Sequence, residues 1–208
     1  MKKVILNTLL LTAIAVIAVS CSKPQPVQTI ESLKAAIKGE SNASATYKAF
    51  SAKAAEDGLP NIAKMFVAAA EAEAIHVKNH NAVLLKLGEL EFTAEIKTPE
   101  VSDMKANLKA AIDGETYEFT VMYPSFITIA NAEKCPHALR SFTWARDAEA
   151  THAKLYTKVL DILNTTGNDE TISAVWFVCP KCGDLFDTIE GLDNCPLCGT
   201  NSASFLKF

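Results

Sequence analysis

The sequence has no excess of positive charge: its 208 residues include 20 lysines and arginines against 24 aspartates and glutamates, for a net charge of −4. Surfaces that bind nucleic acids need clustered basic residues, so we predict no nucleic-acid partner. The composition of a disordered protein is also absent, because 49% of the residues are hydrophobic and can form a core.

Histidine is scarce, with four residues, whereas cysteine occurs six times. A disulfide framework is not indicated, because most of the cysteines form two C-x-x-C pairs near the C-terminus, a spacing typical of metal binding. These four are Cys179, Cys182, Cys195 and Cys198. Cys21 and Cys135 stand apart, and each needs its own explanation.

The N-terminus has the three regions of a secretory signal peptide: two lysines, an apolar run and small residues directly before Cys21. The run is too short for a membrane span, which needs about 20 residues. Its end resembles the cleavage box of bacterial lipoproteins, in which the cysteine is lipid-modified. We therefore predict a signal over residues 1–20, a lipidated Cys21 and a polar tether over 21–27.

This pattern predicts an exported protein that faces the periplasm or the cell exterior and meets the membrane only through its lipid anchor. Three alternatives stay open. The segment could be a plain signal peptide or an uncleaved anchor, and the protein would be cytoplasmic if the signal is not used.

The following stretch contains an internal repeat. Leu33–Glu40 recurs as Leu108–Glu115, and Glu73-x-x-His76 recurs as Glu149-x-x-His152. The hydrophobic period is helical, so each copy predicts a helix pair with a proline early in its second helix. We expect helices at about 29–57, 60–87, 102–133 and 136–165. The repeat offset grows from 75 to 76 residues along the copies, which we interpret as one extra residue in the second interhelical turn.

Each repeat places a glutamate and a histidine at the centre of a buried helical stripe. Glu40 and Glu115 share the buried faces of the other two helices, and Glu118 lies one turn from Glu115. Unpaired carboxylates in an apolar core are prohibitively costly, so the sequence predicts bound cations. The predicted ligands are Glu40, Glu73, His76, Glu115, Glu118, Glu149 and His152. Oxygen ligands with two imidazoles suit iron or manganese, in the pattern of dinuclear carboxylate bundles.

Two neighbours of these ligands are expected to play no part in metal binding. His80 lies on the same stripe one turn beyond His76, and we expect it to be a hydrogen-bonded core residue. Glu71 lies off the stripe and is expected in solvent.

The C-terminal cysteine pairs predict a small metal-stabilised domain. A glycine follows each pair, at Gly183 and Gly199, and permits the positive φ that such turns need. Because so short a unit has little core, binding by four thiolates would supply much of its folding free energy. The spacing alone leaves both a zinc ribbon and a single iron site open.

Together these features resemble rubrerythrin over about residues 28–208. The resemblance implies a mainly α fold, a ferritin-like four-helix bundle followed by a small rubredoxin-like β/loop metal domain. It also implies two non-haem irons in the bundle and one iron in the four-cysteine site, with zinc as the alternative there. The expected domains are 28–167 and 174–208, joined by a linker over 168–173.

The resemblance also implies roles for single residues. Glu73 and Glu149 would bridge the two irons, and one iron would exchange His76 for Glu118 as the centre is oxidised. Tyr47 and Tyr123 match tyrosines that hydrogen-bond the ligating carboxylates. The residues that the resemblance implies for catalysis are Glu118, His76, Tyr47 and Tyr123.

The implied activity is a peroxidase that reduces hydrogen peroxide to water in oxidative stress defence. Electrons would come through the four-cysteine iron from a donor protein, rubredoxin or an NADH-linked reductase, and would cross between the subunits of a homodimer. Two alternatives are a ferritin-like protein for iron oxidation or storage and a zinc-ribbon interaction module on a metal-binding bundle.

Three features depart from the family pattern. Export is unusual for it, because the expected electron donors are cytoplasmic. Asp184 follows Gly183 where family members often have an aromatic residue, so the redox potential is expected to differ. Cys135 aligns with Leu59 in the other repeat, which favours a packing residue over a redox thiol.

Overall fold

A computed structural model describes residues 25–208 of the chain, and the predicted signal and Cys21 lie outside the described residues. The helices are α1 (Val27–Glu56), α2 (Pro60–Lys86), α3 (Met104–Tyr117), the π-helical turn η1 (Glu118–Met122), α4 (Tyr123–Ala132) and α5 (Pro136–Thr166). The C-terminal elements are β1 (Phe177–Val178), β2 (Leu185–Phe186), the 3₁₀ turn η2 (Ser202–Ser204) and β3 (Leu206–Lys207). Within residues 25–208, no helix is both long and apolar enough to cross a bilayer.

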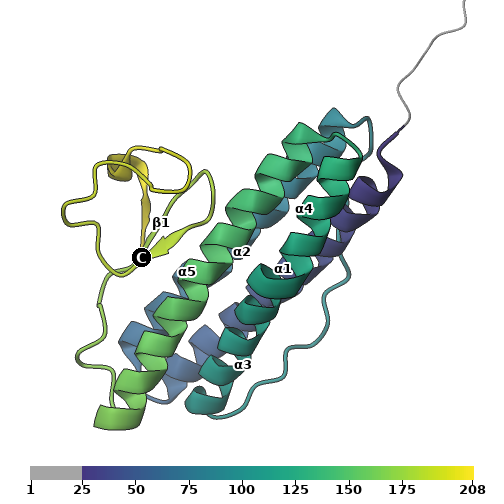
Figure 1. Ribbon diagram of the computed structural model, residues 1–208. Coiled ribbons are helices and arrows are strands. Elements are labelled where there is room, and N and C mark those ends of the chain that lie inside the picture. Colours follow the sequence, from purple (N-terminus) through teal and green to yellow (C-terminus); the bar gives the residue numbers. More distant parts are fainter. Residues whose placement is uncertain (1–24) are drawn as a thin grey trace, which may run out of the picture.

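The long helices lie side by side in a four-helix bundle, in which α3, η1 and α4 together form one of the four (Figure 1). The first helix pair, α1 with α2, packs against the second pair, and the connection from α2 to α3 runs along the outside of the bundle. Pro60 and Pro136 begin α2 and α5, where a missing N–H costs no helical hydrogen bond. The predicted helix pairs are therefore present.

The extra residue of the second repeat does not lie in the interhelical turn, and that interpretation was wrong. The turns 57–59 and 133–135 have the same length. The insertion instead lies in η1, whose wider i→i+5 turns take up one more residue than an α-helix does. The third helix is thus interrupted between Glu118 and Met122, directly before α4, whose second residue is Pro124.

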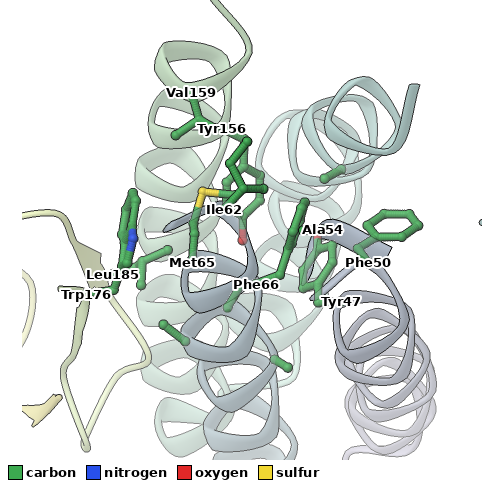
Figure 2. Packing of buried hydrophobic residues seen from close by; sticks show 14 of the residues in the cluster. Tyr47, Phe50, Ala54, Ile62, Met65, Phe66, Tyr156, Val159, Trp176 and Leu185 are labelled. Carbon is green, nitrogen blue, oxygen red and sulfur yellow. The ribbon is translucent and has the colours of Figure 1, made fainter. Parts of the chain in front are cut away.

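The C-terminal domain is an antiparallel sheet of strand order β2-β1-β3 with the cysteine turns around it. It packs against α2 and α5. Trp176 and Leu185 are buried in the same hydrophobic cluster as Met65 and Val159 of the helices (Figure 2). Because the domain shares a core with the bundle, its position relative to the helices is fixed by apolar packing.

The segment between α5 and β1 is also attached to the bundle. Asp169 is 4% exposed, and its Oδ2 accepts hydrogen bonds from the backbone N–H groups of Asn61 at 2.6 Å and Ile62 at 3.1 Å. These are two of the unpaired donors at the start of α2. A residue more than 100 positions away therefore caps this helix and holds the chain that leads to the C-terminal domain.

We expect Asp169→Ala to lower the free energy of unfolding by about 1–2 kcal/mol, because loss of a helix cap leaves buried N–H groups unpaired. The neighbouring Glu170 is exposed, so Glu170→Ala is the matched control and should change stability little. Thermal and denaturant unfolding of the two variants measure the difference. Equal stability of the two would contradict the capping role.

Candidate metal centres

Two groups of candidate metal ligands meet at the centre of the bundle. One consists of Glu40, Glu73, His76 and Glu149, and the other of Glu73, Glu115, Glu149 and His152. In each group, one ligand atom from every residue lies within 4.8 Å of the others. Glu73 and Glu149 belong to both groups, which is the arrangement of two bridging carboxylates between a pair of ions.

The polar atoms of these residues fit cations. The side chains are at most 1% exposed, yet oxygens of all four glutamates and Nδ1 of His152 have no hydrogen-bond partner among the described residues. His152 Nδ1 lies 2.8 Å from Glu149 Oε2, and His76 Nδ1 lies 2.9 Å from Glu149 Oε1. Buried polar atoms without partners cost about 1–3 kcal/mol each, and a pair of metal ions would satisfy them. The oxygen and imidazole donors fit iron or manganese.

The pKa values record the crowding of charge. Burial, together with Glu149 and Glu73, raises the pKa of the Glu40 carboxyl well above its usual range. Burial also raises the pKa of Glu73, but the two neighbouring histidines together outweigh it and lower that pKa to about 2. For His76, burial lowers the pKa, but Glu149 and Glu73 together raise it well above its usual range. Burial and neighbouring carboxylates thus disfavour the ionised form of Glu40, whereas the positive charge of the histidines favours that of Glu73.

Two tyrosines hold the outer glutamates in place. The Tyr47 hydroxyl of α1 donates to Glu115 Oε1, and the Tyr123 hydroxyl of α4 donates to Glu40 Oε1. The expected hydrogen bonds are therefore present, and they are reciprocal between the two repeats. The match explains the π-helical turn: Glu40 and Glu115 differ by 75 positions, whereas Tyr47 and Tyr123 differ by 76, so the inserted residue must lie between the glutamate and the tyrosine.

Glu118 lies apart from both ligand groups. It is the first residue of η1 and partly buried, and its Oε1 lies 3.7 Å from the position that a Cβ on Gly39 would take. Burial and the nearby Glu40 raise its pKa well above the usual range. In this structure, therefore, His76 and not Glu118 completes the first ligand group.

His80 is fully buried, and both its ring nitrogens have partners. Nε2 lies 3.1 Å from the Tyr123 hydroxyl, and Nδ1 lies 2.9 Å from Ser141 Oγ. The prediction of a hydrogen-bonded core residue agrees with these contacts. Glu71 is exposed, as expected.

The four C-terminal cysteines form a second candidate metal site. Cys179 Sγ lies 3.4 Å from Cys198 Sγ, and Cys182 Sγ lies 3.5 Å from Cys195 Sγ. Four sulfurs at about 2.3 Å from a metal have similar spacings along the edges of a tetrahedron. Cys135 is free and buried and packs with the bundle core, in keeping with the packing role that the repeat alignment favoured.

The two sites are joined by hydrogen bonds within one chain. His76 Nε2 lies 2.9 Å from the backbone oxygen of Cys182, and His152 Nε2 lies 3.0 Å from that of Gly183. A carbonyl oxygen only accepts, so both histidines carry their proton on Nε2 and present Nδ1 to the metal. Contact between the sites thus needs no second subunit, unlike the transfer between subunits that the resemblance implied.

Gly183 is required for this contact. Its φ is +80°, and a Cβ there would overlap the His76 ring and lie 3.0 Å from the backbone oxygen of Ala72. Gly199, in the corresponding turn of the second cysteine pair, has a φ of +73° and nothing within 4 Å of the same position. Sequence reasoning assigned both glycines to turn geometry and missed the close approach at Gly183, because backbone carbonyls give no sequence signal.

Asp184, one of the three departures from the family pattern, lies beside the cysteine site. It is 1% exposed, its Oδ2 lies 3.9 Å from Cys195 Sγ, and its Oδ1 has no partner among the described residues. Burial raises the pKa of this carboxyl to about 6. A carboxyl group therefore stands beside the sulfur ligands, at the position where an aromatic ring was expected.

The fold and the two sites define a ferritin-like dinuclear metal bundle with a C-terminal four-cysteine domain. Comparison with known proteins agrees: the family model described as Rubrerythrin matches residues 31–160. The chain belongs to the rubrerythrin family, and the predicted fold class is confirmed.

Individual relatives cover nearly the whole chain. Nigerythrin from Nitratidesulfovibrio vulgaris is 34% identical over 190 residues, which are 91% of each chain. Rubrerythrin-2 from Clostridium acetobutylicum is 34% identical over 184 residues, 86% of this chain and 96% of the relative. A solved structure of nigerythrin in its mixed-valence state superposes with a TM-score of 0.79, at 34% identity over 91% of each chain.

The metal assignment predicts that Glu73→Ala removes most of the bundle-bound metal, because this residue belongs to both ligand groups, while the four-cysteine metal stays. Glu71→Ala, two positions away on the same helix, should keep all the metal. Metal analysis of both variants, purified without oxygen, measures the ratio. Full metal content in Glu73→Ala would overturn the bridging role.

Proposed function

We propose that the protein is a non-haem di-iron peroxidase that reduces hydrogen peroxide to water in oxidative stress defence. The observation that carries the proposal is the placement of His76 and His152, each of which faces the dinuclear site through Nδ1 and the cysteine domain through Nε2. A storage protein has no need of a second metal site in hydrogen-bond contact with the first. The family relationship supports iron, since one nigerythrin structure is described as fully reduced and all ferrous.

Six residues would hold the iron pair: Glu40, Glu73, His76, Glu115, Glu149 and His152. Bound iron would supply Lewis acidity and one-electron chemistry at both sites. Around it, Tyr47 and Tyr123 orient Glu115 and Glu40 by donating hydrogen bonds. Glu118 lies outside both ligand groups, whereas His76 belongs to the first of them. An exchange of His76 for Glu118 as an iron ligand would start from this arrangement.

Cys179, Cys182, Cys195 and Cys198 would hold the third iron. Cys182 would supply one of the four sulfur ligands, and its own backbone carbonyl is the group that His76 contacts. Covalent bonds and one hydrogen bond therefore connect the two sites. Beyond the chain, the proposal requires an electron donor, which we take to be a rubredoxin or an NADH-linked reductase, and we propose a homodimer as the assembly.

The test of this function is the reaction of reduced protein with peroxide. We expect anaerobically reduced protein that holds three irons per chain to be reoxidised by hydrogen peroxide much faster than by oxygen, with absorbance changes at both sites. Fast turnover with oxygen and added ferrous iron, and a slow reaction with peroxide, would indicate the ferritin-like alternative. One zinc per chain in the cysteine site would favour the interaction-module alternative.

A second prediction concerns the contact between the sites. Gly183→Ala should slow the reoxidation of the cysteine-bound iron by about tenfold or more, because the added methyl group pushes the cysteine turn away from His76 and small misplacements of reacting groups have large effects on rate. Gly199→Ala has the same unfavourable φ without a contact and is the control. Stopped-flow absorbance of the two reduced variants after mixing with peroxide gives the rates. Equal rates would show that the contact is not used.

We also propose that the protein is exported and lipidated on Cys21, since the N-terminal pattern has the regions of a lipoprotein signal. The expected mature chain begins at Cys21 and carries a lipid mass. Mass spectrometry of the protein from cell membranes measures this, and a soluble chain that begins at Met1 would refute it.

A further inference from the structure

A line of hydrogen bonds leads from the dinuclear site towards the surface, and metal binding does not require its outer members. Tyr123 donates to Glu40, His80 Nε2 lies 3.1 Å from the Tyr123 oxygen, and Ser141 Oγ lies 2.9 Å from His80 Nδ1. Tyr123 and His80 are 0% exposed, and Ser141 is 7% exposed. The line therefore crosses the core and ends at the edge of the bundle.

The donors along this line all point inward. A metal-bound carboxylate can only accept, so the Tyr123 proton lies towards Glu40 and the Tyr123 oxygen is free to accept from His80 Nε2–H. A neutral imidazole with its proton on Nε2 has an acceptor at Nδ1, which takes the Ser141 hydroxyl proton. Burial keeps the imidazole neutral, since it lowers the pKa of His80 to about 3. Each group can thus pass a proton to the next one inward.

The outer end of the line meets a cavity. Ser141 lines a cavity of about 330 Å³, together with the polar residues Asn79, His137 and Arg140. His137 and Arg140 are exposed, so the cavity is open to solvent, and polar groups of this kind hold water. Water in the cavity can therefore reach the Ser141 hydroxyl.

The other half of the bundle lacks such a line. There, Tyr156 takes the place of His80 on the helical stripe, and its hydroxyl has no hydrogen-bond partner among the described residues. The repeat equivalent of Ser141 is Met65, which is fully buried and apolar. Because the two halves hold equivalent ligands, the line on one side is not a requirement of metal binding.

We propose that Ser141 and His80 relay protons from the cavity through Tyr123 to Glu40 at the dinuclear site. In one transit, cavity water protonates Ser141 Oγ, whose own proton passes to His80 Nδ1. The His80 Nε2 proton passes to the Tyr123 oxygen, and the Tyr123 proton passes to Glu40. One proton enters and one is delivered, with no change in electron count. The role rests on the proposed function, because reduction of one peroxide to two waters consumes two protons and two electrons.

The kinetic test uses the iron-loaded full chain. We expect Ser141→Ala and His80→Phe to slow single-turnover reoxidation by peroxide by about tenfold or more, the lower range for loss of a proton-transfer group, and to change the solvent isotope effect. Ser141→Thr keeps the hydroxyl and should restore the rate. Tyr156→Phe is the matched control on the other side and should react like the unchanged protein. Unchanged rates and isotope effects in both Ser141→Ala and His80→Phe would overturn the relay.

A second measurement does not depend on peroxide chemistry. In zinc-loaded, ¹⁵N-labelled protein, NMR should show the His80 proton on Nε2 and its exchange with solvent slowed by about tenfold in Ser141→Ala, but not in Tyr156→Phe. A proton on Nδ1, or equal exchange in all variants, would overturn the relay. If the His80 tautomer and its proton exchange are as expected but the iron-loaded wild-type protein does not react with peroxide, the proposed function fails while the proton path stands.

Discussion

The packing of ionisable groups inside the bundle is the constraint on which the rest of the structure depends. Four glutamates and two histidines occupy the core between the helices at 1% exposure or less, where unpaired charge is prohibitively costly. Cations held by the two ligand groups would reconcile the ionised groups with their surroundings. The helical stripes, the tyrosine hydrogen bonds and the protons on the histidines can all be understood as means of presenting oxygen and nitrogen lone pairs to those ions.

The same constraint decides where the second repeat can absorb its insertion. Glu115 must stay level with Glu40, and Tyr123 must reach Glu40 as Tyr47 reaches Glu115. One extra residue between them would rotate Tyr123 out of the core in a regular α-helix. The π-helical turn over Glu118–Met122 takes up the residue without rotation. Since π-helical turns are otherwise rare, its position at the metal site follows from the need to keep both tyrosines in register.

Six of the seven residues predicted as ligands of the dinuclear site meet in the two groups, and Glu118 does not. The sequence could indicate these six because Glu-x-x-His places two side chains on one face of a helix and because the repeat shows the motif twice. The C-x-x-C pairs were equally informative. It was not sufficient to place the insertion, since residues of a π-helical turn look like any others in a helix. It also could not predict that His76 meets the carbonyl of Cys182, because backbone groups are common to all sequences and the glycine at 183 already had an explanation as a turn residue.

The differences between the two halves of the bundle lie around one of the two candidate metal positions. Glu118 takes the place of Ala43 of the first repeat, and after burial the charge of Glu40 contributes most to its raised pKa. The line from His80 also ends at Glu40, through Tyr123. Both belong to the ion position that Glu40 and His76 complete, whereas the position of Glu115 and His152 has the apolar surroundings of Tyr156 and Met65. Duplication accounts for a pair of equivalent metal positions. The later differences give one of them a further carboxylate and a line of hydrogen bonds to the bundle edge, so the proposed ligand exchange and the proposed proton delivery would act at the same ion.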